Sequence, residues 1–186
     1  MTSTITDFST LTGTYAIDVA HSRFGFVARH AMVTKVRGAF NEFEGAATID
    51  GSDPSKSTVA VTLDVASIDT RNGQRDDHLR NNDFLDVATY PKITFTSTSI
   101  EHDGGDTFLV TGDLTIKDVT RPVTIPLEYQ GSAKDPFGND RIGFEGDLVI
   151  NRKDWGVTWN VALEAGGVLV SEKITLEFEI SAIKQA

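Results

Sequence analysis

Four histidines, His21, His30, His78 and His102, are the side chains best suited to bind a metal ion or to transfer a proton. No two of them have a metal-ligand spacing such as i, i+4 on a helix, and no carboxylate-rich cluster completes a ligand set. We therefore predict no metal site and expect the histidines to make structural hydrogen bonds.

Asp18, His21 and Ser22 include the residue types of a hydrolase triad. Neighbouring side chains on a strand point to opposite faces, so these three residues cannot assemble a triad locally. The chain also has no G-x-S-x-G nucleophile elbow and no glycine-rich phosphate loop of the G-x-x-x-x-G-K or G-x-G-x-x-G type. The sequence therefore predicts a protein that is not an enzyme and that requires no cofactor.

A third group of reactive side chains alternates cations with carboxylates. Its members are Arg71, Arg75, Asp76, Asp77, Arg80 and Asp83. The simpler interpretation is a solvated surface with weak ion pairs. The functional interpretation is that one or two of the arginines bind a phosphate or carbonyl group, because a guanidinium donates two parallel hydrogen bonds to such oxygens.

These charges lie in the one stretch with a helical pattern, from Arg75 to Phe95. Asp76 or Asp77 can cap a short helix there. Pro91 ends the stretch, because the residue before a proline is driven to an extended conformation, and a strand follows. A helix this short cannot bury apolar side chains by itself, so it must close something flat or hollow. Its apolar side consists of Leu79, Phe84 and Leu85.

The rest of the chain alternates apolar and polar residues with a period of two, which is typical of half-buried strands. A slip of this phase predicts a β-bulge near Asn41 or Glu42. About eight antiparallel strands with one apolar face close most economically into a barrel, because closure removes exposed edges. A two-sheet sandwich is the alternative, since the alternation alone does not separate the two.

The composition is that of a globular protein, with 39% hydrophobic and 24% charged residues among 186. We expect one domain over residues 13–186, after a loose N-terminal leader at residues 1–12. The formal net charge of −10, without a block of Lys and Arg, argues against nucleic-acid binding. The absence of cysteine excludes disulfides and thiol catalysis.

Targeting signals are absent from the sequence. The first residues have neither the basic start nor the apolar region of a secretory signal, and no apolar run is long enough to cross a bilayer. We therefore expect a cytoplasmic protein without a transmembrane segment.

The predicted inner face carries many phenylalanines, in phase with small residues such as Ala28, Gly38 and Gly112. An eight-stranded barrel has room for packed side chains or for one small ligand. A mixture of large and small side chains is compatible with either, so the alternation alone leaves a solid core and a cavity both open.

Five segments together resemble the YceI family, a group of lipocalin-like barrels that bind polyisoprenoid lipids. They are HSRFGFVARH (His21 to His30), VRGAFNEFEG (Val36 to Gly45), SIDTRNGQRDDHLRNNDFLDVATYPKITFTS (Ser67 to Ser97), GDLTIKDVTRPV (Gly112 to Val123) and NRKDWGVTWN (Asn151 to Asn160). Two positions depart from the family pattern: Leu85 and Trp155 stand where a phenylalanine is usual. Both changes keep an apolar side chain and suggest a reshaped pocket.

The resemblance implies an antiparallel lipocalin-like β-barrel with a short helix inserted between strands, and an elongated apolar channel between the barrel wall and that helix. The residues expected to line this channel are Phe24, Phe26, Val36, Phe40, Leu63, Leu79, Phe84, Leu85, Ile93, Phe95, Leu114, Phe144, Leu148 and Trp155. Those expected at its mouth, near a ligand head group, are His30, Arg75, Arg80 and Trp159.

The function implied is non-catalytic binding of a polyprenyl quinone or polyprenyl diphosphate, for transport, storage or sequestration. A quinone needs one hydrogen-bond donor, whereas a diphosphate needs at least two cations. Two alternatives stay open: a barrel enzyme or stress protein that acts on a lipid or amide substrate at the channel mouth, and an interaction module with a packed interior. The resemblance also allows a homodimer formed through the outer faces.

Overall fold

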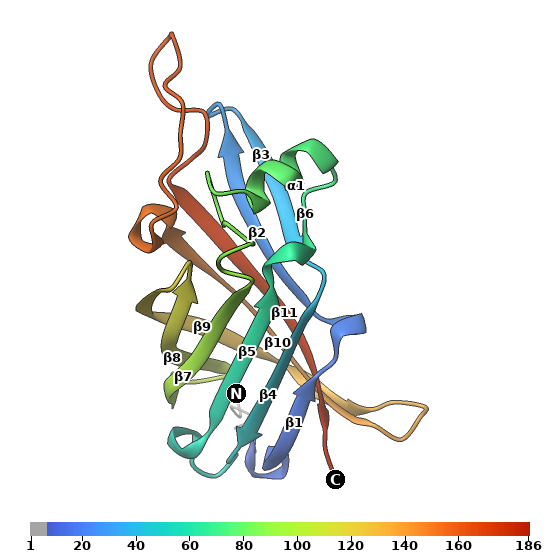
Figure 1. Ribbon diagram of the computed structural model, residues 1–186. Coiled ribbons are helices and arrows are strands. Elements are labelled where there is room, and N and C mark those ends of the chain that lie inside the picture. Colours follow the sequence, from blue (N-terminus) through green and yellow to red (C-terminus); the bar gives the residue numbers. More distant parts are fainter. Residues whose placement is uncertain (1–6) are drawn as a thin grey trace.

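The structure is a computed structural model, and it describes residues 7–186. Among these residues, eleven β-segments form one antiparallel sheet, and a pairing between β1 and β11 closes the sheet into a barrel (Figure 1). The segments are β1 (Gly13–Ile17), β2 (Arg23–His30), β3 (Thr34–Phe40), β4 (Phe43–Ile49), β5 (Thr58–Asp64), β6 (Ile68–Asp69), β7 (Lys92–His102), β8 (Thr107–Ile116), β9 (Val119–Lys134), β10 (Asp140–Asn151) and β11 (Lys173–Lys184).

Three pairs of segments continue one another across short breaks: β1 with β2, β3 with β4, and β5 with β6. The partners show this continuity, because β2 pairs with β3 while β1 pairs with β4, and β6 pairs with β3 while β5 pairs with β4. Eight long strands result, so the predicted barrel is confirmed and the sandwich is excluded. The phase slip at Asn41 and Glu42 proves to be one of the breaks, not a single-residue bulge.

The barrel wall has a gap on one side, which α1 (Gly73–Arg80) and its flanking segments cover. Strand β5 pairs with β7 as far as Asp64 and Lys92, whose side chains form an ion pair. Beyond this pair the chain pairs only briefly with β3, through β6, and then leaves the sheet until β7 begins. Figure 1 shows α1 at one end of the barrel, beside β3 and β6, and β1 with the C-terminus at the other. The inserted helix was predicted correctly.

The predicted helix cap was wrong. Asn72 is the N-cap, and its side chain accepts a hydrogen bond from the Arg75 amide at 3.0 Å. Asp76 is instead buried, where its carboxylate accepts bonds from the Thr70 amide at 2.8 Å and the Thr70 hydroxyl at 2.5 Å. Asp76 therefore fastens α1 to the end of β6, and the helix ends at Arg80, before Phe84 is reached.

Two apolar clusters lie inside the barrel at different heights. The buried residues of one cluster are Val65, Ile93, Leu114, Ile150 and Trp155. The other surrounds four buried residues near β1 and the chain end, Leu11, Tyr15, Ile142 and Ala182, and Phe8 packs against it. We call the barrel end with this second cluster the closed end, and the end near α1 the cavity end.

The N-terminal region differs from the predicted loose leader. Residues 1–6 lie outside the described residues, but Ser9–Leu11 form a 3-10 turn and Leu11 is buried. The apolar side chains of Phe8 and Leu11 account for this order, because they pack inside the closed end. No helix among residues 7–186 is long and apolar enough to span a membrane.

Candidate functional site

An internal cavity of about 230 Å³ occupies the barrel between the closed end and the segments around α1. Its wall takes inward-facing side chains from strands all around the barrel, because alternate residues of each strand point to the same face. Among the described residues on this wall, only Thr94 and Arg152 carry a polar side chain. The cavity is therefore an apolar chamber with one buried cation.

Most of the residues predicted to line a channel lie on this wall. They are Phe24, Phe26, Phe40, Leu63, Leu79, Phe84, Leu85, Ile93, Phe95, Leu114 and Leu148. Small residues make room for the large rings: a Cβ at Gly38 would lie only 2.4 Å from the ring of its cross-strand partner Phe26. Glycine at this position lets the Phe26 ring lie against the neighbouring strand β3, so that the ring does not fill the centre of the cavity.

Three predicted lining residues lie off the wall. Phe144 belongs to the closed end, where its ring centroid is 5.6 Å from that of Tyr129. Trp155 is buried in the core and donates its indole N–H to the Leu114 carbonyl at 2.9 Å. Val36 is half-buried on β3, and its partner on β2, Ala28, lines the cavity instead.

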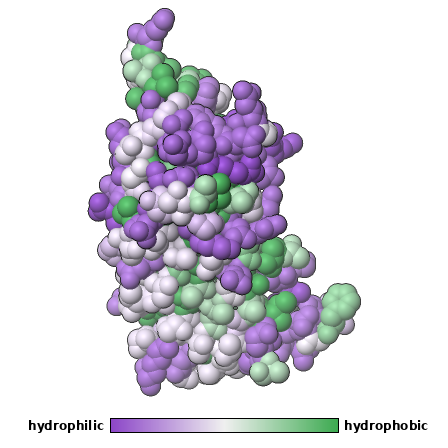
Figure 2. Space-filling model, viewed as in Figure 1, coloured by the Kyte–Doolittle hydropathy of each residue, from purple (hydrophilic) through white to green (hydrophobic). Residues whose placement is uncertain are grey.

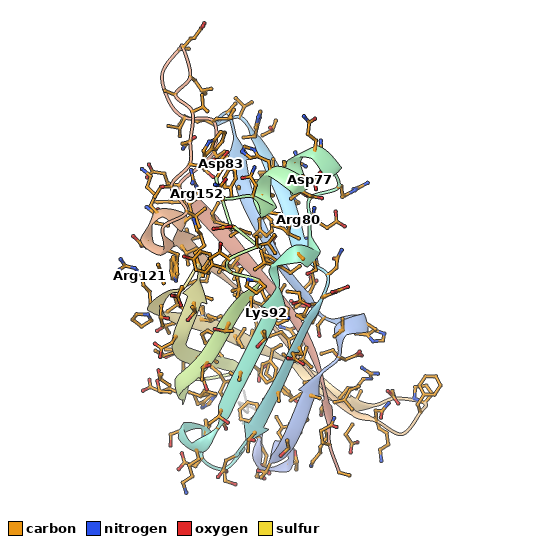
Figure 3. All side chains as sticks on the ribbon, viewed as in Figure 1. Asp77, Arg80, Asp83, Lys92, Arg121 and Arg152 are labelled. Carbon is orange, nitrogen blue, oxygen red and sulfur yellow. The ribbon has the colours of Figure 1, made fainter. Side chains whose placement is uncertain are left out.

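The two arginines predicted at the mouth are bonded to the protein itself. Arg75 donates to the hydroxyl and the carbonyl oxygen of Thr70, both at 2.7 Å. Arg80 donates to the carbonyls of Ala66 and Ile68 and to the Asp77 carboxylate, at 3.0, 3.1 and 3.0 Å (Figure 3). Neither side chain lies on the cavity wall. Both arginines hold α1 against the strand β6.

Trp159 belongs to a group of rings that we call the aromatic lid: His78, Phe84 and Trp159. The His78 ring meets Phe84 at a centroid distance of 5.0 Å and Trp159 at 4.7 Å, and the Phe84 and Trp159 rings are 5.1 Å apart. His78 also shares a hydrogen bond of 2.9 Å with Asp83. Phe84 lines the cavity, so the lid joins the segment after α1 to the segment after β10 at the cavity end.

His30, the remaining predicted mouth residue, is exposed at the end of β2 and forms a bridge with Val170. It does not lie on the cavity wall, although Val170 does. A head-group role for His30 stays a prediction, as it does for Arg75, Arg80 and Trp159.

Arg152 is the charged wall residue that the sequence did not lead us to expect. Only 5% of it is exposed, and its guanidinium donates to the carbonyls of Val157, Ser171 and Val170 at 2.7, 2.9 and 3.3 Å. Burial lowers the pKa of Arg152 from its ordinary value, and the Glu172 carboxylate opposes this shift. Alternation was the available signal, because Arg152 follows β10 directly and continues the phase of Leu148 and Ile150.

The residues considered for hydrolysis are used in other ways. His21 and Asp18 form a pair at 2.6 Å, and Asp18 also accepts a bond from Arg141 at 2.6 Å. The Ser22 hydroxyl is directed at the β11 backbone, where it donates to the Ser181 carbonyl at 3.1 Å and accepts from the Ser181 amide at 2.9 Å. Within the described part of the chain, no group of three or more histidines or carboxylates is arranged to hold a metal ion.

Comparison with known proteins finds a family match along most of the chain. The family model of the YceI-like domain matches residues 15–182. A protein of Escherichia coli named YceI is 37% identical over 179 residues, which cover 95% of this chain and 90% of the relative.

Two solved structures share the fold. Burkholderia cenocepacia BcnA superposes with a TM-score of 0.77 at 28% identity, over 89% of this chain and 98% of BcnA. A polyisoprenoid binding domain from Saccharophagus degradans, implicated in plant cell wall breakdown, gives a TM-score of 0.68 over 92% of this chain and 98% of that domain. Its identity is 18%, so this second likeness concerns the fold alone.

Proposed function

Because the chain belongs to the YceI-like family, we propose that it binds a polyprenyl quinone inside its barrel and transports, stores or sequesters it without chemical change. The observation that carries this proposal is the internal apolar cavity with one buried cation, Arg152, on its wall. A domain with the same fold is described as polyisoprenoid binding.

The apolar wall supports a hydrocarbon tail as the main part of the ligand. Each methylene-sized group moved from water into such a site contributes about 0.8 kcal/mol, so a few prenyl units supply substantial affinity without ion pairs. A polar chain would lose its hydrogen bonds to water and find, among the wall residues within 7–186, only Thr94 and Arg152 as side-chain partners.

Arg152 supports a quinone over a diphosphate as the head group. Three of the five guanidinium N–H groups bond to backbone carbonyls within residues 7–186, so at most two stay for a ligand oxygen. A quinone carbonyl needs one such donor and brings no charge. A diphosphate brings several negative charges into a buried site whose wall offers a single cation, and that is costly.

The first test is native mass spectrometry of the purified chain, with organic extraction of whatever it carries. We expect an isoprenoid species with a quinone head group, or one-to-one uptake of added polyprenyl quinone by the empty protein. A fatty acid in the extract would support lipid binding in the cavity but contradict a quinone as the ligand. A protein that is empty and takes up no added polyprenyl quinone would overturn the proposal itself.

A matched pair of variants then assigns the binding to the cavity. Val123→Phe adds a ring at the cavity wall, whereas Val149→Phe adds the same ring on β10 at a residue that is 57% exposed. We expect Val123→Phe to weaken quinone binding at least about tenfold, because the ring occupies the ligand's space. The Val149→Phe control should bind like the parent, and equal binding by both variants would contradict a ligand inside the barrel.

A further inference from the structure

The cavity end carries exposed apolar side chains on two neighbouring loops. Met32 and Val33, in the turn between β2 and β3, are 61% and 73% exposed, and Val161, on the loop before β11, is 46% exposed. We call these three residues the apolar tip. In Figure 2 the same end of the molecule shows a cluster of hydrophobic surface below a hydrophilic extremity.

Backbone contacts hold the two loops of the tip together. The Ala31 amide donates to the Leu169 carbonyl at 2.7 Å, and His30 forms a bridge with Val170. Met32 lies against Gly167 so closely that a Cβ there would be 2.3 Å from its sulfur. Residues 161–169 form a hairpin of their own, in which the Leu169 amide donates to the Val161 carbonyl at 2.9 Å. The two loops of the tip therefore pack against each other.

The β2–β3 turn places two apolar residues in a backbone conformation that disfavours them. Ala31 and Met32 have φ angles of 51° and 62°, in the left-handed region where Asn, Asp and Gly are favoured. An apolar pair at these positions is unfavourable for the turn, and neither residue is buried in the core. Departures from local preference of this kind are expected where a residue serves a contact outside the folded chain.

The two loops of the tip and their flanks carry two exposed cations and one exposed carboxylate, Glu164 on the 161–169 hairpin, whereas the whole chain is strongly acidic. The chain has a net charge of −10, yet no Asp or Glu occurs between Asp18 and Glu42. Arg29 and Lys35 flank the turn and are exposed, and within residues 7–186 Lys35 has no hydrogen-bond or ion-pair partner. Two cations beside exposed apolar side chains match an anionic lipid surface, which attracts Lys and Arg and accepts apolar side chains below its head groups.

The tip is continuous with the cavity. Ala28, on β2 just before the turn, and Val170, the bridge partner of His30, both lie on the cavity wall. A second exposed aromatic, Phe137, is 88% exposed on the hairpin between β9 and β10, which Figure 1 shows at the far end of the barrel. Phe137 lies between Asp135 and Asp140, whose carboxylates pair with Arg141 and Lys134, so this hairpin has no excess of cations to attract an anionic surface.

We propose that the apolar tip docks on an anionic lipid membrane, with Met32, Val33 and Val161 entering the interface and Arg29 and Lys35 contacting the head groups. This contact turns the cavity end toward the bilayer. It goes beyond the binding of a quinone and requires no ligand inside the barrel.

The test is co-flotation of the full chain with vesicles. The probes are phosphatidylcholine vesicles containing phosphatidylserine and vesicles of phosphatidylcholine alone. We expect binding to the anionic vesicles only, weakened by added salt because exposed charges are screened. Lys35→Gln should weaken it about fivefold, as loss of one cation near the surface predicts. The double change Met32→Gln and Val33→Thr should weaken it at least about tenfold, since two apolar side chains are lost from the interface.

Phe137→Gln is the matched control and should bind the vesicles like the parent. Equal binding of the parent to both vesicle types, or an equal loss in Phe137→Gln, would overturn the proposal. It would also be overturned if the parent were a dimer without lipid and the Met32/Val33 variant a monomer, because the tip would then join two copies. Quinone uptake from detergent should be unchanged in the tip variants, so failure of docking and failure of quinone binding are separate results.

Discussion

The two ends of the barrel are built from the same kinds of inward-facing side chains, yet one is solid and the other is hollow. At the closed end, Phe8 enters from the chain before β1, and its ring lies 5.0 Å from Phe108 and 5.5 Å from Tyr129. At the cavity end, α1 and the aromatic lid lie over the opening and insert no such plug into it. Segments outside the sheet, not the strands, therefore decide which end is filled.

The turn after β4 makes room for the chain segment that carries Phe8. A Cβ at Gly51 would lie 1.7 Å from the Phe8 carbonyl oxygen, so only glycine lets the backbone of residues 8–11 pass there. Tyr15 completes the arrangement from β1: it is buried and donates its hydroxyl to the Leu11 carbonyl at 2.8 Å. The cavity end is held by polar bonds to backbone carbonyls instead, from Arg75, Arg80 and Arg152.

Truncating one aromatic at each end gives the largest expected effect. Tyr15→Ala should lower the free energy of unfolding by about 4 kcal/mol, because it leaves a hole in packed surroundings and removes a buried hydrogen bond. Phe26→Ala should cost only about 1 to 2 kcal/mol, since part of its ring faces the cavity and has fewer contacts to lose. Urea unfolding of both variants measures the difference, and equal losses would mean that the cavity end is as tightly packed as the closed end.

Arg152→Lys should have the next largest effect and should act at the cavity end alone. Lysine keeps a charge but cannot reproduce a planar fork bonded to three carbonyls, so we expect a loss of about 2 to 3 kcal/mol in unfolding free energy. Hydrogen exchange of the amides in residues 157–171 should accelerate, while the closed end keeps its protection.

Arg121→Lys is the matched control for this change. Arg121 is exposed at the protein surface (Figure 3) and donates one hydrogen bond, to the Asp154 carbonyl at 2.6 Å, so its replacement should cost under about 1 kcal/mol. If the two variants lost the same stability, the fork of Arg152 would not be what holds the 157–171 segment.

The contrast between the two ends also explains which features of the barrel interior could be predicted from the sequence. Alternation identifies the inward face of each strand, which is why Phe24, Leu63 and Ile93 were correctly expected to face the interior. Alternation does not give the height along the barrel axis, so Phe144 was assigned to the channel although it lies at the closed end. Height depends on strand register, which arises from pairings distant in the sequence.

The cations show a second limit. Arg75 and Arg80 stood beside the predicted helix and were expected near a head group; they bond to backbone carbonyls of β6 and its flanks, and the head-group role stays a prediction. Arg152 stood between Asn151 and Lys153 in a polar run that resembled an exposed turn, although its phase with Ile150 pointed inward. Which guanidinium is satisfied by the backbone and which is buried at a cavity depends on tertiary contacts that no local pattern records.

Trp159→Ala should lower stability less than Arg152→Lys does, but it should speed up dissociation of the ligand. Removing this ring from the aromatic lid should cost about 1 kcal/mol in unfolding free energy, because Trp159 is half-buried and its partners His78 and Phe84 keep their mutual contact. Dissociation of bound polyprenyl quinone, followed by stopped-flow fluorescence, should become faster. Unchanged dissociation would mean that the ligand leaves by another route than the lid.

The smallest effect is expected from a charge at the closed end and should appear only as a dependence on pH. Arg141, and after it His21, hold the pKa of Asp18 below its ordinary value. A carboxylate whose pKa is lower in the folded state stabilises the fold above the unfolded pKa, near 3.9, and this contribution is lost as the pH falls through the folded pKa.

Asp18→Asn should therefore be less stable than the parent at neutral pH, and the difference should shrink below about pH 4 as the parent loses the same contribution. The control at the cavity end is Asp77→Asn, because the side chain of Asp77 is 82% exposed beside Arg80 and its ion pair contributes little in water. Urea unfolding at neutral and acid pH should separate the two variants. A difference for Asp18→Asn that persisted at low pH, or an equal one for Asp77→Asn, would mean that the ionised Asp18 carboxylate makes no particular contribution to the stability of the closed end.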